Sequence, residues 1–234
     1  MANVVGLINL HSDVSLKGLT ERRPVASVSF LGRYGVIDFV LSNFSNSHIA
    51  KVGILVKEKP RSLLKHIGSG NAWNFNSKRG GISLLYDEKY ANSNMYNHDI
   101  NNMLENIAFL EKSTEDYVVI SPAHIITTMD FSDVVEAHEK SGCDVTVVYK
   151  KIKDANEAFI GSDFLKIKDK QVVDFELNKG NRKDRSISLE TYVINRKALI
   201  KMLYKAQKVS VFYDLRDTLN YLKDEMKINA YEYK

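Results

Sequence analysis

The residues best placed to do chemistry in this 234-residue chain lie in three short segments, each of which follows an apolar run. These segments are residues 9–20, 57–60 and 121–130. In an open α/β sheet, ligands bind beyond the carboxyl ends of the strands. If the apolar runs are neighbouring parallel strands, the three segments should therefore meet at one crevice.

The first segment would have to surround a phosphate if the crevice bound a nucleotide. Such a loop needs glycines, so that backbone N–H groups can close on the anion. In the stretch Asn9 to Gly18 the single glycine stands at the far end, and Asp13 would repel a polyphosphate. On physical grounds the segment is a poor phosphate-binding loop.

The third segment offers a histidine but no carboxylate at the strand end. A Mg²⁺-dependent phosphoryl or nucleotidyl transferase needs such a carboxylate, and Pro122 and Ala123 cannot supply it. Asp130 could hold a metal, although its place before Phe131 favours a helix N-cap. His124 could act as a general base, although a histidine without a carboxylate partner is more often structural. The sequence leaves both alternatives open.

The composition is ordinary for a soluble globular protein, with 44% hydrophobic and 26% charged residues. A net charge of +4 is too small to indicate nucleic acid. No apolar run approaches the ~20 residues of a membrane helix, and the first residues do not form a secretory signal. The lone Cys143 excludes a disulfide framework. We therefore expect a cytoplasmic protein with no nucleic-acid or membrane partner.

Apolar runs alternate with amphipathic stretches over the first 150 residues, which predicts parallel strands joined by helices. After residue 150, short strands with hairpin-like turns follow one another. The expected strands are 4–8, 52–56, 117–120, 144–149, 164–167, 172–175, 187–194 and 228–233, and the expected helices are 37–49, 61–67, 100–110, 131–140, 197–206 and 215–222. The pattern predicts one α/β domain, residues 1–234, with a Rossmann-like, mixed, mostly parallel sheet. Residues 68–101, rich in Asn, Gly and Ser, are expected to form a mobile or irregular loop over the crevice.

A likeness to a known family rests mainly on residues 20–47. The stretches T-E-R-R-P-V-A-S-V-S-F (20–30), L-G-R-Y-G-V-I-D-F (31–39) and L-S-N (41–43) resemble ADP-glucose pyrophosphorylases, also called glucose-1-phosphate adenylyltransferases. That family reads roughly P-F-G-G-x-Y-R-I-I-D-F-x-L-S-N here. The likeness covers most of residues 4–140 and implies a sheet of the nucleotide-diphospho-sugar transferase type. The retained positions, which would shape a vestigial substrate pocket, are Gly32, Tyr34, Asp38, Ser42, Asn43 and Ser188.

The chain departs from the family at the positions that handle phosphate and metal. The family's first loop reads A-G-G-x-G-T-R-L-x-P-L-T. The replaced family positions are the three loop glycines (now Leu10, His11 and Asp13), the loop arginine (Ser15), a phosphate-contacting lysine (Val25), the G-T-A nucleotide segment (His98, Asp99 and Ile100), the metal aspartate (Ala123) and the sugar-phosphate lysine (Asn178, or Lys179 if the alignment shifts by one).

These losses resemble the GlgD-type subunit of bacterial glycogen biosynthesis, which lacks the active-site residues and assembles with a catalytic subunit to raise or regulate its activity. The resemblance implies a hetero-oligomer with a catalytic ADP-glucose pyrophosphorylase subunit. It also implies no catalytic residue, no metal-binding residue and no cofactor, with ATP, ADP-glucose and glucose 1-phosphate as ligands that the pocket could retain. The chain ends at Lys234, before the family's second metal aspartate and its left-handed β-helix domain, so we expect the N-terminal domain only.

The sequence leaves two alternative functions open. The first is an active ADP-glucose pyrophosphorylase that joins ATP and glucose 1-phosphate, with Mg²⁺ held by a relocated carboxylate such as Asp130 or Asp13. The second is an interaction domain that binds no ligand in its cleft.

Overall fold

The main sheet of this computed structural model has nine strands among the described residues, which are all except 1–2, 13, 76–77, 79, 94 and 211–212. Its spatial order is β5-β4-β1-β6-β10-β7-β11-β9-β8. The strands are β1 (Val4–Asn9), β4 (Lys51–Val56), β5 (Gly81–Tyr86), β6 (Tyr117–Pro122), β7 (Val145–Ile152), β8 (Asp163–Lys168), β9 (Gln171–Leu177), β10 (Arg185–Asn195) and β11 (Ile228–Glu232). Two short strands, β2 (Ser29–Phe30) and β3 (Tyr34–Gly35), form a separate hairpin.

The pairing of the strands changes from parallel to mixed in the second half of the chain, where the sequence pattern changes to successive short strands. The strands β1, β4, β5 and β6 pair in parallel, and β11 pairs in parallel with β7. Antiparallel pairing enters with β10, which lies between β6 and β7, and with the β8–β9 hairpin. Seven strands of this sheet thus run in one direction, while β9 and β10 run in the other. The predicted fold class, an α/β protein with a Rossmann-like mixed sheet, is confirmed.

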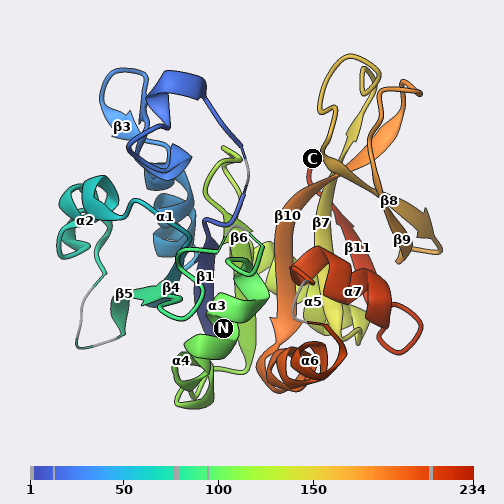
Figure 1. Cartoon of the computed structure of the whole chain (residues 1–234). Coiled ribbons are helices and arrows are strands. Elements are labelled where there is room, and N and C mark those ends of the chain that lie inside the picture. The colour runs from blue at the N-terminus through green and yellow to red at the C-terminus, as the bar shows by residue number, and fades with distance from the viewer. Residues whose placement is uncertain (1–2, 13, 76–77, 79, 94, 211–212) are drawn as a thin grey trace.

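Helices cover both faces of the sheet (Figure 1). They are α1 (Ile37–Asn46), α2 (Arg61–Ile67), α3 (Asp99–Glu105), α4 (Ile107–Glu111), α5 (Phe131–Ser141), α6 (Arg196–Val209) and α7 (Leu215–Leu222). Helices α1, α2 and α5 pack in one hydrophobic core, and α3, α4, α6 and α7 pack in the other. In the described part of the chain, no helix combines the length and the apolar character that crossing a bilayer demands.

The strands supply both cores because successive side chains point to opposite faces of a sheet. In β1, Val5 and Leu7 enter one core and Ile8 enters the other. The close packing also leaves no room for a side chain at Gly53 in β4, because a Cβ there would lie 2.7 Å from Leu85 Cδ1 and 2.9 Å from Leu7 Cδ2.

Two sequence expectations differ from the structure. The stretch 68–101 is not irregular throughout, because β5 lies within it and pairs in parallel with β4. The part of that expectation that concerns residues 76–77, 79 and 94 lies outside the described residues. The expected helix 100–110 is two helices, α3 and α4, which meet at Asn106. The Asn106 amide donates to the Tyr86 carbonyl at 2.7 Å, and this side-chain bond accompanies the break.

Candidate functional site

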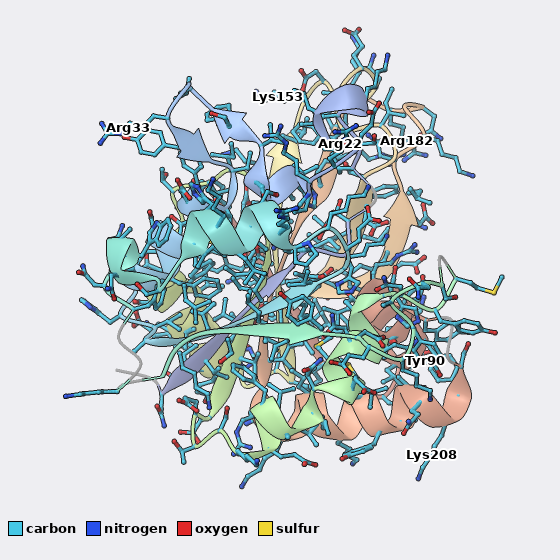
Figure 2. All side chains as sticks on the ribbon, turned by 60° about the vertical axis from the view of Figure 1, so that its left-hand side comes forward. Arg22, Arg33, Tyr90, Lys153, Arg182 and Lys208 are labelled. Carbon is cyan, nitrogen blue, oxygen red and sulfur yellow. The ribbon has the colours of Figure 1, made fainter. Side chains whose placement is uncertain are left out.

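A cleft opens at the carboxyl ends of β1, β4 and β6, where the three sequence segments were expected to meet. Its main hollow has a volume of about 1010 Å³ and shares Asn9, Lys57 and His124 with a smaller hollow of about 190 Å³. Each of these three residues comes from a different segment, so the segments do converge. Basic side chains such as Arg22 and Arg182 project at the same end of the molecule (Figure 2).

The loop after β1 uses its own side chains to satisfy its backbone N–H groups. Asn9 Oδ1 accepts from His11 N at 3.0 Å, and Ser12 Oγ accepts from Val14 N at 3.2 Å. Further along, Thr20 Oγ1 accepts from Leu16 N at 3.0 Å, and Ser15 Oγ accepts from Lys17 N at 3.3 Å. A phosphate-binding loop keeps such N–H groups open for the anion. In this chain four of them are already bonded within the loop.

A buried carboxyl, Asp99, lies at the start of α3 against the cleft. Its oxygens accept from Asn9 Nδ2 at 2.8 Å, Ile100 N at 2.8 Å and Leu215 N at 2.9 Å. Burial, and next the neighbouring Asp214 carboxylate, raise the pKa of Asp99 to about 7, although the three N–H donors oppose the rise. Asp99 therefore joins β1, α3 and α7 at the cleft and carries a proton for part of the time near neutral pH.

Asp163, at the start of β8, is a second carboxyl of the cleft with a raised pKa. Burial raises the pKa of Asp163 to about 6, and the Arg216 guanidinium opposes the rise. Arg216 Nε lies 3.5 Å from Asp163 Oδ2, and Arg216 Nη1 lies 3.1 Å from Asp217 Oδ1. The charge of Arg216 is thus shared between two carboxylates.

The charged groups that line the main hollow are evenly mixed. Among the described lining residues, the carboxyls are Asp99, Asp163, Glu190 and Asp214, and the cations are Lys57, Lys150 and Arg216. A site for a triphosphate concentrates positive charge. The main hollow lacks such a concentration, whereas the smaller hollow beside the loop after β1 is lined by Arg23, Lys57 and Lys59 with one carboxylate, Glu58.

The residues at the end of β6 do not fit a magnesium ion. Ala123 is buried in the core and has no side-chain oxygen that could bind a metal. Asp130 caps α5 as predicted, accepting from Ser132 N at 2.8 Å and from Ser47 Oγ at 3.2 Å. The Ser132 N–H is the main cause that lowers the pKa of Asp130. Asp13, the other carboxylate considered, lies outside the described residues. No group of three or more metal-ligating side chains occurs among the residues that the structure describes.

The six residues retained from the family pocket fall into different places. Ser188, in β10, lines the main hollow. Asn43 contacts a residue of the hollow's lining. Its side-chain amide donates at 3.0 Å to the backbone carbonyl of Thr127, and Thr127 lines the hollow. Ser42 lies half-buried in α1, beside Asn43.

The other three shape the β2–β3 hairpin. Gly32 has a φ of 72° in its turn, and the Tyr34 ring packs edge-on against Phe39 at a centroid distance of 6.1 Å. Asp38 accepts from Gly35 N at 2.9 Å and bonds His66 Nε2 at 2.5 Å. The structure thus brings Ser188 alone of the six to the hollow's wall.

Sequence reasoning named Ser188 but missed the charged residues that reach the cleft from the second half of the chain. These are Lys150, Asp163, Glu190, Asp214 and Arg216. Asp214 carries one usable signal, because an aspartate directly before an apolar-periodic segment predicts a helix N-cap, and its side chain accepts from Asp217 N. The others lie on β7, β8, β10 and α7, so their position in the cleft depends on how these elements pack together.

The mixed sheet, the helices on both faces and the cleft at the strand ends define an α/β protein whose cleft lies where ligands bind in open sheets of this class. Residues 15–221 match the family model described as nucleotidyl transferase, and the chain belongs to that family.

Individual relatives agree with this family. A glucose-1-phosphate adenylyltransferase of Fervidobacterium nodosum is 31% identical over 210 residues, covering 89% of this chain and 50% of its own length. The enzyme of that description from Fusobacterium nucleatum is 31% identical over 224 residues, covering 94% and 58%. These matches bear out the resemblance to ADP-glucose pyrophosphorylases. The chain spans about half the length of the curated relatives it matches.

A solved structure supports the fold. A protein described as a glucose-1-phosphate thymidylyltransferase from Bacillus anthracis superimposes with a TM-score of 0.72, covering 100% of this chain and 87% of that one. At 13% identity it bears on the fold alone.

Proposed function

We propose that this chain is a nucleotidyltransferase-like domain, residues 1–234, of a catalytically impaired, regulatory subunit of glucose-1-phosphate adenylyltransferase. It acts in the cytoplasm in glycogen biosynthesis, as part of a hetero-oligomer with a catalytic subunit. The relatives' names supply the reaction, which forms ADP-glucose and pyrophosphate from ATP and glucose 1-phosphate. The shape of the family's substrate pocket is retained by six residues, Gly32, Tyr34, Asp38, Ser42, Asn43 and Ser188.

The observation that carries the proposal is the hydrogen bonding of the loop after β1, whose own side chains accept from its backbone N–H groups. The N–H groups of His11, Val14, Leu16 and Lys17 are bonded to side chains of the same loop. A triphosphate would have to break these bonds before it could use the N–H groups, and it would gain no basic side chain from Ser15 or Val25.

The remaining charges do not compensate for this loss. Negative charge on the α-phosphate and on the leaving pyrophosphate needs metal, Lys or Arg and N–H donors in the transition state. Ala123 supplies no carboxylate for a metal, and the main hollow carries about as many carboxyls as cations, so the basic side chains of the smaller hollow, Arg23 and Lys59, would have to act without a metal. Removing one such donor typically costs roughly 100-fold or more in rate, and here several are missing together.

The test is a pyrophosphate-release assay with ATP, glucose 1-phosphate and Mg²⁺. We expect no ADP-glucose synthesis by this chain alone. In its full-length context, the protein should associate with the catalytic subunit of the same organism, measured by sedimentation, and should change its rate. A catalytic subunit assayed at the same concentration without this protein is the matched control.

The Ala123→Asp variant sharpens the test, because one restored carboxylate leaves the loop unchanged and should not restore synthesis. Robust turnover by the unmodified chain would refute the proposal and favour an active ADP-glucose pyrophosphorylase. A catalytic subunit that neither binds this protein nor changes its rate would refute the regulatory role.

A further inference from the structure

Glu190 adopts an unusual backbone conformation within the long strand β10. Its φ is 50°, in the left-handed region that side chains other than glycine rarely occupy. The residue lies where the pairing of β10 with β7 shifts register between Ser188 and Thr191. Such bulges re-aim side chains and often occur next to functional sites.

Neighbouring side chains hold this bulge in place. Ser188 Oγ accepts from Glu190 N at 3.1 Å. On the other side of the bulge, Thr191 Oγ1 bonds Ser121 Oγ on β6 at 3.1 Å and donates to the Leu189 carbonyl at 3.2 Å. A strained residue persists only where its surroundings determine its conformation, and such residues cluster at functional sites.

The bulge directs the Glu190 carboxylate into the main hollow. Its Oε1 lies 3.6 Å from His124 Nε2, across the junction of β10 and β6. The Glu190 side chain is 37% exposed and lines the hollow, which is the space that a ligand would enter. Its charge contributes to the raised pKa of Asp163 and of Tyr192.

The basic groups near this carboxylate are His124, at 3.6 Å, and the cations Arg216 and Lys150, which have other partners. Arg216 is engaged by Asp163 and Asp217. Lys150 bonds the Tyr233 carbonyl at 3.5 Å and lies 4.9 Å from the centre of the Tyr233 ring. A phosphate that entered on the β10 side would therefore meet the Glu190 carboxylate.

We propose that Glu190 is a specificity-determining residue of this cleft, whose fixed carboxylate repels phosphorylated ligands and leaves neutral sugars unaffected. The ligand class, a sugar phosphate, rests on the proposed function. The repulsion is separate from the loss of the loop, because Glu190 lies on β10, which β6 separates from β1 in the sheet.

Glu190→Gln tests the charge, because it keeps the size and the backbone conformation of the residue. At roughly 5 Å in a water-like dielectric, a carboxylate opposes a phosphate dianion by roughly five-fold in Kd after salt screening. We expect E190Q to bind glucose 1-phosphate roughly five-fold more tightly than the unmodified chain in calorimetric titration. Binding of glucose, the neutral counterpart of this ligand, should stay the same.

Glu136→Gln is the matched control, since Glu136 lies exposed on α5 and pairs with Lys140. This variant should bind glucose 1-phosphate as the unmodified chain does. The gain of E190Q should also shrink at high salt, because screening weakens a charge effect. Glu190→Gly removes the charge and the backbone strain together, so it should show the same gain and a thermal midpoint no lower than that of E190Q.

E190Q that binds glucose 1-phosphate no more tightly, or gains equally for glucose, would overturn the inference. The proposed function fails on a different result, synthesis of ADP-glucose by the unmodified chain, so the two failures are distinguishable.

Discussion

Replacing Asp99 by asparagine should change how the stability of the protein depends on pH. The pKa of Asp99 rises from 3.8 to about 7 on folding, mainly by burial and next by Asp214. The native carboxyl therefore keeps its proton at a pH where the unfolded carboxyl has lost it. Stability contributed by this group thus falls as pH rises from about 4 to about 7, and it stays constant above that.

The magnitude follows from the distance between the assay pH and the native pKa. One pKa unit corresponds to about 1.4 kcal/mol, and about two units separate pH 5 from the native value. The free energy of unfolding should therefore fall by about 3 kcal/mol between about pH 5 and about pH 8 through this group alone. The asparagine side chain of the D99N variant cannot ionise, but its carbonyl oxygen can still accept from Ile100 N and Leu215 N. The D99N variant should lack this part of the pH dependence.

Urea unfolding of both proteins at the two pH values measures the effect. The difference between the unmodified chain and D99N reports Asp99 together with its interaction with Asp214, because the more distant titrating groups contribute equally to both. Asp214→Asn is the control, since asparagine also caps helices and only the neighbouring charge is lost. We expect D214N to reduce the pH dependence in part, because burial remains as the larger cause. Parallel pH profiles for the unmodified chain and D99N would refute the reasoning.

Two further predictions concern packing and loop structure. Gly53→Ala should lower the free energy of unfolding by about 1–3 kcal/mol, because the new Cβ would press on Leu7 and Leu85; a thermal midpoint unchanged from that of the unmodified chain would contradict this. Asn178→Ala should cost about 1–3 kcal/mol, because its buried amide donates to the carbonyls of Ala155, Ala158 and Phe159. Limited proteolysis should then cut within 155–162 first, and a cleavage pattern identical to that of the unmodified chain would argue against this role.

Much of the fold could be predicted from apolar patterning alone. The helices 61–67 and 215–222 begin and end where the sequence indicates. Strand β5 was missed because its residues stand in an Asn-, Gly- and Ser-rich stretch. Its strand identity comes from pairing with β4, which sequence patterning does not reveal.

The candidate site was predictable on one side only. Asn9, Lys57 and His124 follow directly from the rule that ligands bind where parallel strands end. Glu190 and Asp163 reach the cleft because β10 enters the sheet between β6 and β7 and carries a bulge. Such long-range pairing has no local signature in the sequence. The presence of the Glu190 and Asp163 carboxyls in the cleft could therefore not be predicted from the sequence.

The place of β10 also governs how the chain must be made. This strand comes after both of its neighbours in the sequence. Strand β6 therefore lacks its second pairing partner, β10, while residues 123–195 are synthesised. At typical rates of about 5–20 residues per second, this wait lasts roughly 4 to 15 seconds. During that time the nascent chain exposes an apolar strand edge, which is a template for pairing with other chains. The interval between the synthesis of β6 and that of β10 is therefore the period in which the edge of β6 is open to such pairing.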